Sequence, residues 1–179
     1  MKTKLKLQVK RIFIMLFAIS SIGLWAQTND KENNSNNEIK INMGSLLFEL
    51  PEVSYEHIIN EESSFGISVA FPIDKNKSVS YGFIVYPNYR IYFSNKRAAG
   101  FFFEGNSAIF SQRFQKDGFP ERADKNKIGF GLGIAIGGKF LTKSGFIGEI
   151  YIGGGRNFVN TDIIDSGYPR AGISIGKRF

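Results

Sequence analysis

Few residues in this sequence have both the type and the spacing that catalysis or metal binding requires. The 179 residues include one histidine, His57, and no cysteine, so disulfides and thiolate metal sites are excluded. Histidines and carboxylates do not cluster at metal-ligand spacing. The segment Ser174–Lys177 spells S-x-x-K, a motif that needs a helical turn, whereas on a strand these two side chains point to opposite faces. The glycines at 153–155 lack the Lys-Ser/Thr of a phosphate-binding loop, and we expect neither a metal nor a cofactor.

The charged residues that remain as candidates lie on the glycine- and serine-rich side of alternating segments. In the segment 127–140, Ile134 and other apolar residues at every second position alternate with Gly133 and other small residues. Because successive side chains of a strand point to opposite faces, such a strand is bulky on one face and nearly bare on the other. The same parity assigns six charged residues to the small-residue face: Glu56, Arg90, Glu104, Lys139, Glu149 and Arg178.

The period of two continues from Ile39 to the C-terminus, without a convincing helical pattern, and predicts an all-β fold. Eight strands are expected, at residues 39–49, 52–60, 64–73, 79–93, 100–112, 127–140, 144–155 and 169–179. Pro87 falls inside the fourth of these strands, where it cannot donate to a ladder, and predicts a bulge or a bend. The alternation breaks at the end of the first strand, and the link through Pro51 to the second strand is expected to be very short.

The other predicted connections alternate in length along the chain. Short ones lie at 60–63, 94–99 and 141–145, and mostly longer, polar ones lie at 74–78, 113–126 and 156–169. In an antiparallel up-and-down meander, alternate connections lie at opposite ends, so the longer loops gather at one end. Bacterial outer-membrane barrels have this asymmetry, with short periplasmic turns and longer outer loops.

Interior volume decides which face of such a barrel points inward. An eight-stranded barrel is just wide enough for side chains to fill it, and the aromatic face carries too many large rings to fit. In water that face would be a large aggregation surface, so we expect a transmembrane β-barrel with the apolar face toward lipid. A soluble periplasmic lipid-binding barrel with the two faces exchanged is the alternative. Six phenylalanines next to the short turns predict a periplasmic-side aromatic girdle: Phe65, Phe93, Phe101, Phe140, Phe146 and Phe179.

The N-terminus has the features of a secretory signal. Residues 1–26 combine five basic residues with the apolar run Ile12–Ala26, which is short for a membrane-spanning helix. We expect cleavage after Ala26; an uncleaved anchor helix is the alternative. Removing this segment reduces the 23 basic residues to 18 against 16 acidic ones, so the formal charge of +7 does not indicate nucleic-acid binding. Residues 27–38 have no large apolar side chain and predict a disordered leader before a barrel at 39–179.

The C-terminal residues PRAGISIGKRF resemble the last strand of outer-membrane barrels, in which apolar positions alternate back from a terminal Phe, here Phe179, Ile175 and Ile173. With the export signal and eight strands, the chain resembles the small outer-membrane barrels of the OmpX and OmpA membrane-domain type. The resemblance covers residues 39–179 and implies recognition of the last strand by the barrel-assembly machinery. A leading stretch is also similar to a domain family of unknown function through four residues: Asn42, Pro51, Tyr55 and Glu56.

This resemblance implies a non-enzymatic protein of the bacterial outer membrane, surrounded by outer-membrane lipid. Its function would be structural, or would be interaction at the surface through the longer loops, whose partner the sequence does not name. Two roles are open for the six lumenal charges, an ion-pair plug or the lining of a narrow pore; eight strands leave no aqueous channel, which favours the plug. An outer-membrane lipid-modifying enzyme built around His57 is the alternative. Barrel-type lipid A deacylases have Ser two residues after the His, where this chain has Ile59, and by parity His57 faces lipid.

Overall fold

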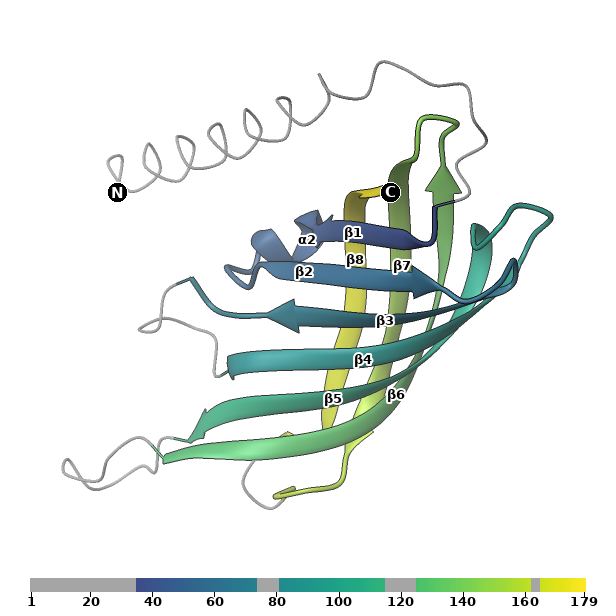
Figure 1. Cartoon of the computed structure of the whole chain (residues 1–179). Helices are drawn as coiled ribbons and strands as arrows, with labels where there is room; N and C mark the ends of the chain where they lie inside the picture. The colour runs from purple at the N-terminus through teal and green to yellow at the C-terminus, as the bar shows by residue number, and fades with distance from the viewer. Residues whose placement is uncertain (1–34, 74–80, 115–124, 162–164) are drawn as a thin grey trace, which may run out of the picture. The chain divides into compact units, whose positions relative to one another are not determined.

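The computed structural model describes residues 35–73, 81–114, 125–161 and 165–179 (Figure 1). The predicted signal at 1–26 lies outside the described residues, as does most of the predicted leader. None of the helices in the described part of the chain is long and apolar enough to cross a membrane.

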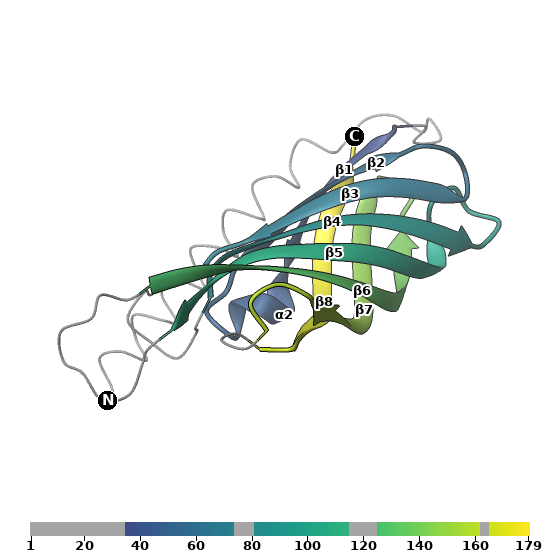
Figure 2. The ribbon, with the colours of Figure 1, turned by 90° about the horizontal axis from the view of Figure 1, so that it is seen from below.

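Eight antiparallel strands close into one barrel in which each strand pairs with the next and the last pairs with the first (Figures 1 and 2). The strands are β1 (Asn37–Asn42), β2 (Glu52–Ile58), β3 (Ser63–Ala70), β4 (Tyr81–Phe93), β5 (Gly100–Phe114), β6 (Lys125–Leu141), β7 (Phe146–Asn157) and β8 (Gly167–Arg178). The prediction of an all-β, up-and-down antiparallel barrel of eight strands is confirmed.

The strands are staggered around the barrel, and the stagger can be counted from the ladders. A walk through ladder partners from Glu38 passes Glu56, Gly66, Asn88, Asn106, Gly133, Gly155 and Tyr168. The direct partner of Glu38 on β8 is Arg178, so the walk returns to β8 ten residues away from it (178 − 168 = 10). Such a shear requires tilted strands and brings residues that are far apart in the sequence to the same level of the lumen.

The connections separate into two kinds at the two ends of the barrel, as expected. Residues 59–62, 94–99 and 142–145 form the short turns at one end. The first link, at the other end, is not the very short one predicted: it runs over residues 43–51 and contains the helical turn α2 (Met43–Leu46).

Strand β1 also differs from the prediction at both of its ends. It ends at Asn42, seven residues earlier than expected, because the Asn42 side chain accepts a hydrogen bond from the Ser45 backbone N–H (3.2 Å) and caps α2. It begins at Asn37, inside the predicted disordered leader, because the carboxylate of Glu38 is held in the lumen by buried basic side chains.

Pro87 was predicted to cause a bulge or a bend, and the bulge is wrong. The β4–β5 ladder keeps one register across this residue, with Val85 opposite Ile109 and Asn88 opposite Asn106. On its other side Pro87 lies opposite Ile67 of β3, so the strand tolerates the missing N–H without an extra residue. The register shift of this ladder lies between Tyr81 and Phe83 instead.

The two faces of the wall have the polarity that the alternation predicts. Along β6, Ile134 is 58% exposed on the outside, whereas inward Ala135 is 2% exposed. The barrel with exchanged faces is therefore wrong, since charged side chains fill the inside. All six girdle phenylalanines are exposed on the outer face near the short turns, and the rings of Phe93 and Phe101 lie 6.0 Å apart across adjacent strands.

Candidate functional site

Ten charged side chains of the described residues are buried inside the barrel, and none of them is more than 4% exposed. Five are acidic and five are basic, so the lumen carries no formal net charge. We call this set the lumenal charge network: Glu38, Glu52, Glu56, Glu104, Glu149, Lys40, Arg90, Lys139, Arg170 and Arg178. All six lumenal residues expected from the sequence lie in it. Salt bridges of 4 Å or less connect all ten into one network.

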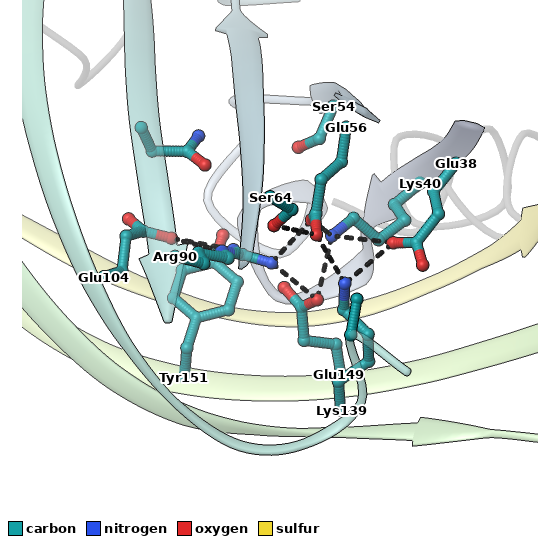
Figure 3. A network of polar contacts seen from close by, with 12 residues as sticks. Glu38, Lys40, Ser54, Glu56, Ser64, Arg90, Glu104, Lys139, Glu149 and Tyr151 are labelled. Atoms are coloured by element: carbon teal, nitrogen blue, oxygen red, sulfur yellow. Dashed lines mark hydrogen bonds and ion pairs between the residues drawn. The ribbon is translucent and has the colours of Figure 1, made fainter. Parts of the chain in front are cut away.

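Glu56 of β2 lies at the centre of the network (Figure 3). One of its carboxylate oxygens is 2.5 Å from Lys40 Nζ and 2.9 Å from Arg90 Nη1, and the other is 2.6 Å from Lys139 Nζ. The hydroxyl of Ser64 also donates to this carboxylate, at 2.6 Å. A carboxylate with this many donors is satisfied without water.

Arg90 of β4 joins three carboxylates at once. Its guanidinium lies 2.7 Å from Glu104, 2.8 Å from Glu149 and 2.9 Å from Glu56. Arg90 and Glu104 are also direct partners in the β4–β5 ladder, which fixes them at one level. The guanidinium carbon also lies 4.4 Å from the centre of the Phe102 ring, a cation–π contact that covers the face of the guanidinium.

The network continues from this centre toward both ends of the barrel. Toward the short turns, Lys139 binds Glu38 at 2.8 Å and Glu38 binds Arg178 at 2.6 Å. Toward the longer loops, Glu104 binds Arg170 at 3.0 Å and Arg170 binds Glu52 at 2.7 Å. Each charge therefore has a partner of opposite sign, as buried charges require.

The short-turn end of the lumen is closed by the 94–99 turn. Ala98 and Ala99 of this turn are buried, and the guanidinium of Arg178 donates to the backbone oxygens of Arg97 (3.0 Å) and Ala98 (2.9 Å). Behind the turn lies a small apolar cluster that contains Ile58 and Phe102. The turn thus covers the mouth and is tied to the charge network by Arg178.

A second apolar layer closes the lumen on the longer-loop side. Tyr86 and Tyr168 lie with their ring centres 5.9 Å apart, and Phe110 and Ile84 pack in the same buried cluster. The guanidinium of Arg170 lies 4.6 Å from the centre of the Tyr86 ring, so this layer rests directly on the charges. The charges therefore lie between this layer and the 94–99 turn, with the rings of Phe102 and Tyr151 packed among them.

The structure adds four members of the network that the sequence analysis did not identify: Glu38, Lys40, Glu52 and Arg170. Glu38 had been assigned to the leader, but Lys40 shares its parity. Arg170 follows Pro169 at the expected start of a strand and shares its parity with Arg178. Only Glu38 lay outside the predicted strands; Lys40, Glu52 and Arg170 lay inside them, and their parity alone would have identified them.

His57 lies apart from the network, on the exposed outer face of β2. Its ring Nδ1 is 2.9 Å from Asn37 Oδ1, and its ladder partners are Asn37 and Phe65. Among the described residues no group of three or more His, Cys, Asp or Glu side chains is arranged to hold a metal ion. In the lumen, all five carboxylates are engaged by basic groups.

Comparison with known proteins supports the fold and nothing narrower. No protein-family model and no curated protein matches the sequence. Among solved structures, the chain is similar to the crystal structure of the N-terminal β-barrel domain of Pseudomonas aeruginosa OprF, with a TM-score of 0.57 and 14% sequence identity. The match covers 81% of this chain and 98% of that one. The chain thus has the closed eight-stranded fold of that barrel, and it fits the small OmpA-type barrels.

Proposed function

We propose that this chain is a non-enzymatic, non-conducting protein of the bacterial outer membrane that acts as a structural or surface-interaction element. The observation that carries the proposal is the lumen. It holds ten paired charges with no net charge, between an apolar layer and the 94–99 turn, inside a wall whose outer face is apolar.

The height of the apolar outer face fits a membrane. On β6, exposed apolar side chains run at every second or fourth position from Ile128 to Phe140. At a rise of about 3.3 Å per residue these positions span roughly 40 Å along the strand, and a tilt of about 35–45° reduces this to roughly 30 Å along the membrane normal. The hydrocarbon core of a bilayer is about 30 Å thick.

The closed lumen supports a plug rather than a pore. An ion path would need charges that face water, whereas each charge here faces another charge and the 94–99 turn covers one mouth. A chain with the same wall but an open lumen would leave these side chains partly exposed.

The position of His57 supports a non-enzymatic role. A lipid-modifying site needs a nucleophile or a general base held by an acid, and the ring of His57 instead contacts the side-chain oxygen of Asn37. The C-terminal strand presents Ile173, Ile175 and Phe179 on the outer face, which supports our expectation that the barrel-assembly machinery recognises it. The partner of the longer loops stays unassigned.

The proposal is tested by reconstituting the purified protein in planar bilayers and in lipid vesicles. We expect insertion, seen as a band that migrates differently before and after boiling in SDS, together with no steady ion conductance. A stable open channel would contradict the plug. Membrane lipid from cells that make the wild-type chain or the His57→Ala variant is expected to be identical; a modification lost in the variant would restore the enzyme alternative.

A further inference from the structure

Strands β1 and β2 are too short to cross a membrane. They have six and seven residues, whereas a tilted spanning strand needs about 9–11. The β1–β8 ladder ends where Asn42 meets Ser174, although β8 continues back to Gly167. The wall of strands is therefore low at β1 and β2, and residues 167–173 of β8 have no strand beside them on that side.

The link 43–51, which contains α2, occupies this low part of the wall. On one side α2 lies against β8 (Figures 1 and 2). There the side chain of Asn42, which caps α2, accepts a hydrogen bond from the Ile173 N–H and donates one to the Ala171 oxygen, both at 3.3 Å. On the other side, the N–H of Phe71 donates to Pro51 O at 3.2 Å. The link therefore bridges β8 and the extension of β3.

The neighbours of the link show its level in the wall. Ile173 on one side is 57% exposed, and Phe71 and Ile73 on the other are 50% and 56% exposed. These side chains belong to the apolar outer face that we propose to face lipid. The link therefore lies within the height of that face, not beyond it.

The backbone of the link is suited to a place in hydrocarbon. The N–H groups of Leu47, Phe48, Glu49 and Leu50 each donate to an oxygen between Gly44 and Leu46, at 3.1–3.2 Å. A backbone segment in lipid must satisfy its polar groups internally. Along the edge of β8 that faces the link, every second residue directs its backbone N–H and C=O toward β1. Phe179 shows this orientation, because its backbone exchanges hydrogen bonds with that of Asn37. Pro169 is one of these alternate residues, and it has no N–H that could be left unpaired.

Two side chains of the link extend the apolar surface. Leu47 is 81% exposed and Phe48 is 74% exposed, while Leu50 turns inward against the cluster around Tyr86 and Tyr168. Two large apolar side chains exposed side by side, and continuous with a lipid-facing surface, indicate a hydrocarbon partner rather than water.

We propose that residues 43–50 form a helical part of the membrane-facing wall, in which Leu47 and Phe48 bind the acyl chains of lipids in the leaflet on the longer-loop side. This inference rests on the proposed membrane location. It goes beyond it by assigning a non-strand segment of the barrel to the hydrocarbon region.

The test places a fluorescent tryptophan on the link in the full chain. The only tryptophan is Trp25, so a Trp25→Phe background has no intrinsic tryptophan signal. Into this background go Phe48→Trp on the link, Ile134→Trp in the outer apolar face and Lys143→Trp in an exposed short turn. Each protein is folded into vesicles of phosphatidylcholine with brominated acyl chains and, separately, titrated with acrylamide in unbrominated vesicles.

We expect Phe48→Trp to follow Ile134→Trp, losing most of its fluorescence in brominated lipid and little to acrylamide, with Lys143→Trp showing the reverse. If Phe48→Trp behaves like Lys143→Trp while Ile134→Trp is quenched by bromine, the inference is wrong and the membrane location stands. If Ile134→Trp is not quenched by bromine, the membrane location falls and the inference falls with it. Should Phe48→Trp fail to fold, Leu47→Trp provides the same reading.

Discussion

Replacing Arg90 by methionine removes the residue that joins three carboxylates of the lumen. Arg90→Met keeps an apolar chain of similar length against Phe102 but leaves Glu56, Glu104 and Glu149 each with one cation fewer. The lumen then holds four basic and five acidic groups. Breaking a buried pair by removing one partner typically costs about 3–5 kcal/mol, and we expect a loss in that range in the free energy of unfolding.

A second substitution distinguishes direct pairing from overall charge balance. Glu104→Gln restores neutrality in the Arg90→Met background at the ladder partner of Arg90, while its amide oxygen can still accept from Arg170. Glu52→Gln restores the same neutrality, but the salt bridge of Glu52 is to Arg170 and not to Arg90. We expect Glu104→Gln to recover about 1–3 kcal/mol and Glu52→Gln to recover less.

The assay is urea titration of each variant in lipid vesicles, with the folded fraction read from the difference in gel mobility between unboiled and boiled samples. Stability changes of Arg90→Met and Glu104→Gln that simply add, within about 0.5 kcal/mol, would show that the two residues do not interact. Equal recovery by Glu104→Gln and Glu52→Gln would show that only the net charge of the lumen matters. Either result would refute the pairing derived from the structure.

The same assay checks three further changes. Ile134→Arg places a charge on the lipid-facing side of β6 and should cost about 2–4 kcal/mol; no loss in vesicles would mean that this face does not meet lipid. Gly133→Ala should cost about 1–3 kcal/mol, because its new methyl carbon would lie 2.7 Å from Gly154 O. Gly138→Ala, with no atom within 4 Å of the added carbon, is the matched control and should change little. Asn42→Ala removes the cap of α2 and the acceptor of the Ile173 N–H, and should cost about 1–3 kcal/mol; an unchanged midpoint would mean that α2 contributes nothing to the wall.

Alternation, together with the interior volume of the barrel, was enough to predict the faces of the strands. The period of two along β6 separates Ile134 from Gly133 and Ala135, and the volume of an eight-stranded barrel then decides which set points inward. For this reason Glu56, Arg90 and Glu104 could be assigned to the lumen without a structure.

The contacts between those charges could not be predicted in the same way. Lys40 and Glu149 are 2.9 Å apart in the lumen but 109 residues apart in the sequence. Their contact depends on the closure of the barrel and on its ten-residue shear, and the periodicity of the individual strands predicts neither.

The C-terminal end of β1 was mispredicted for a local reason. Asn42 is a poor strand former but an effective helix cap, and the following residues Met43–Leu46 do not alternate between apolar and polar side chains. The composition of this segment fits a strand or a helix equally well. The helical turn is evident only in the structure, where it occupies the gap left by the short strands β1 and β2.

The central claim is a membrane barrel with its apolar face outward and its charges enclosed, and spin-label accessibility along β6 tests it most directly. Because the chain has no cysteine, single cysteines can be introduced at the even positions 130, 132, 134 and 136 and, separately, at Ala135, and can be labelled in the folded protein without background. In vesicles, we predict that labels at the even positions, such as Ile134, collide with oxygen more often than with a water-soluble nickel complex. The cysteine at Ala135, which points into the closed lumen, should not react with the label in the folded protein. Even positions that favour the nickel complex, or a cysteine at Ala135 that is labelled readily, would contradict a lipid-facing wall around a closed lumen.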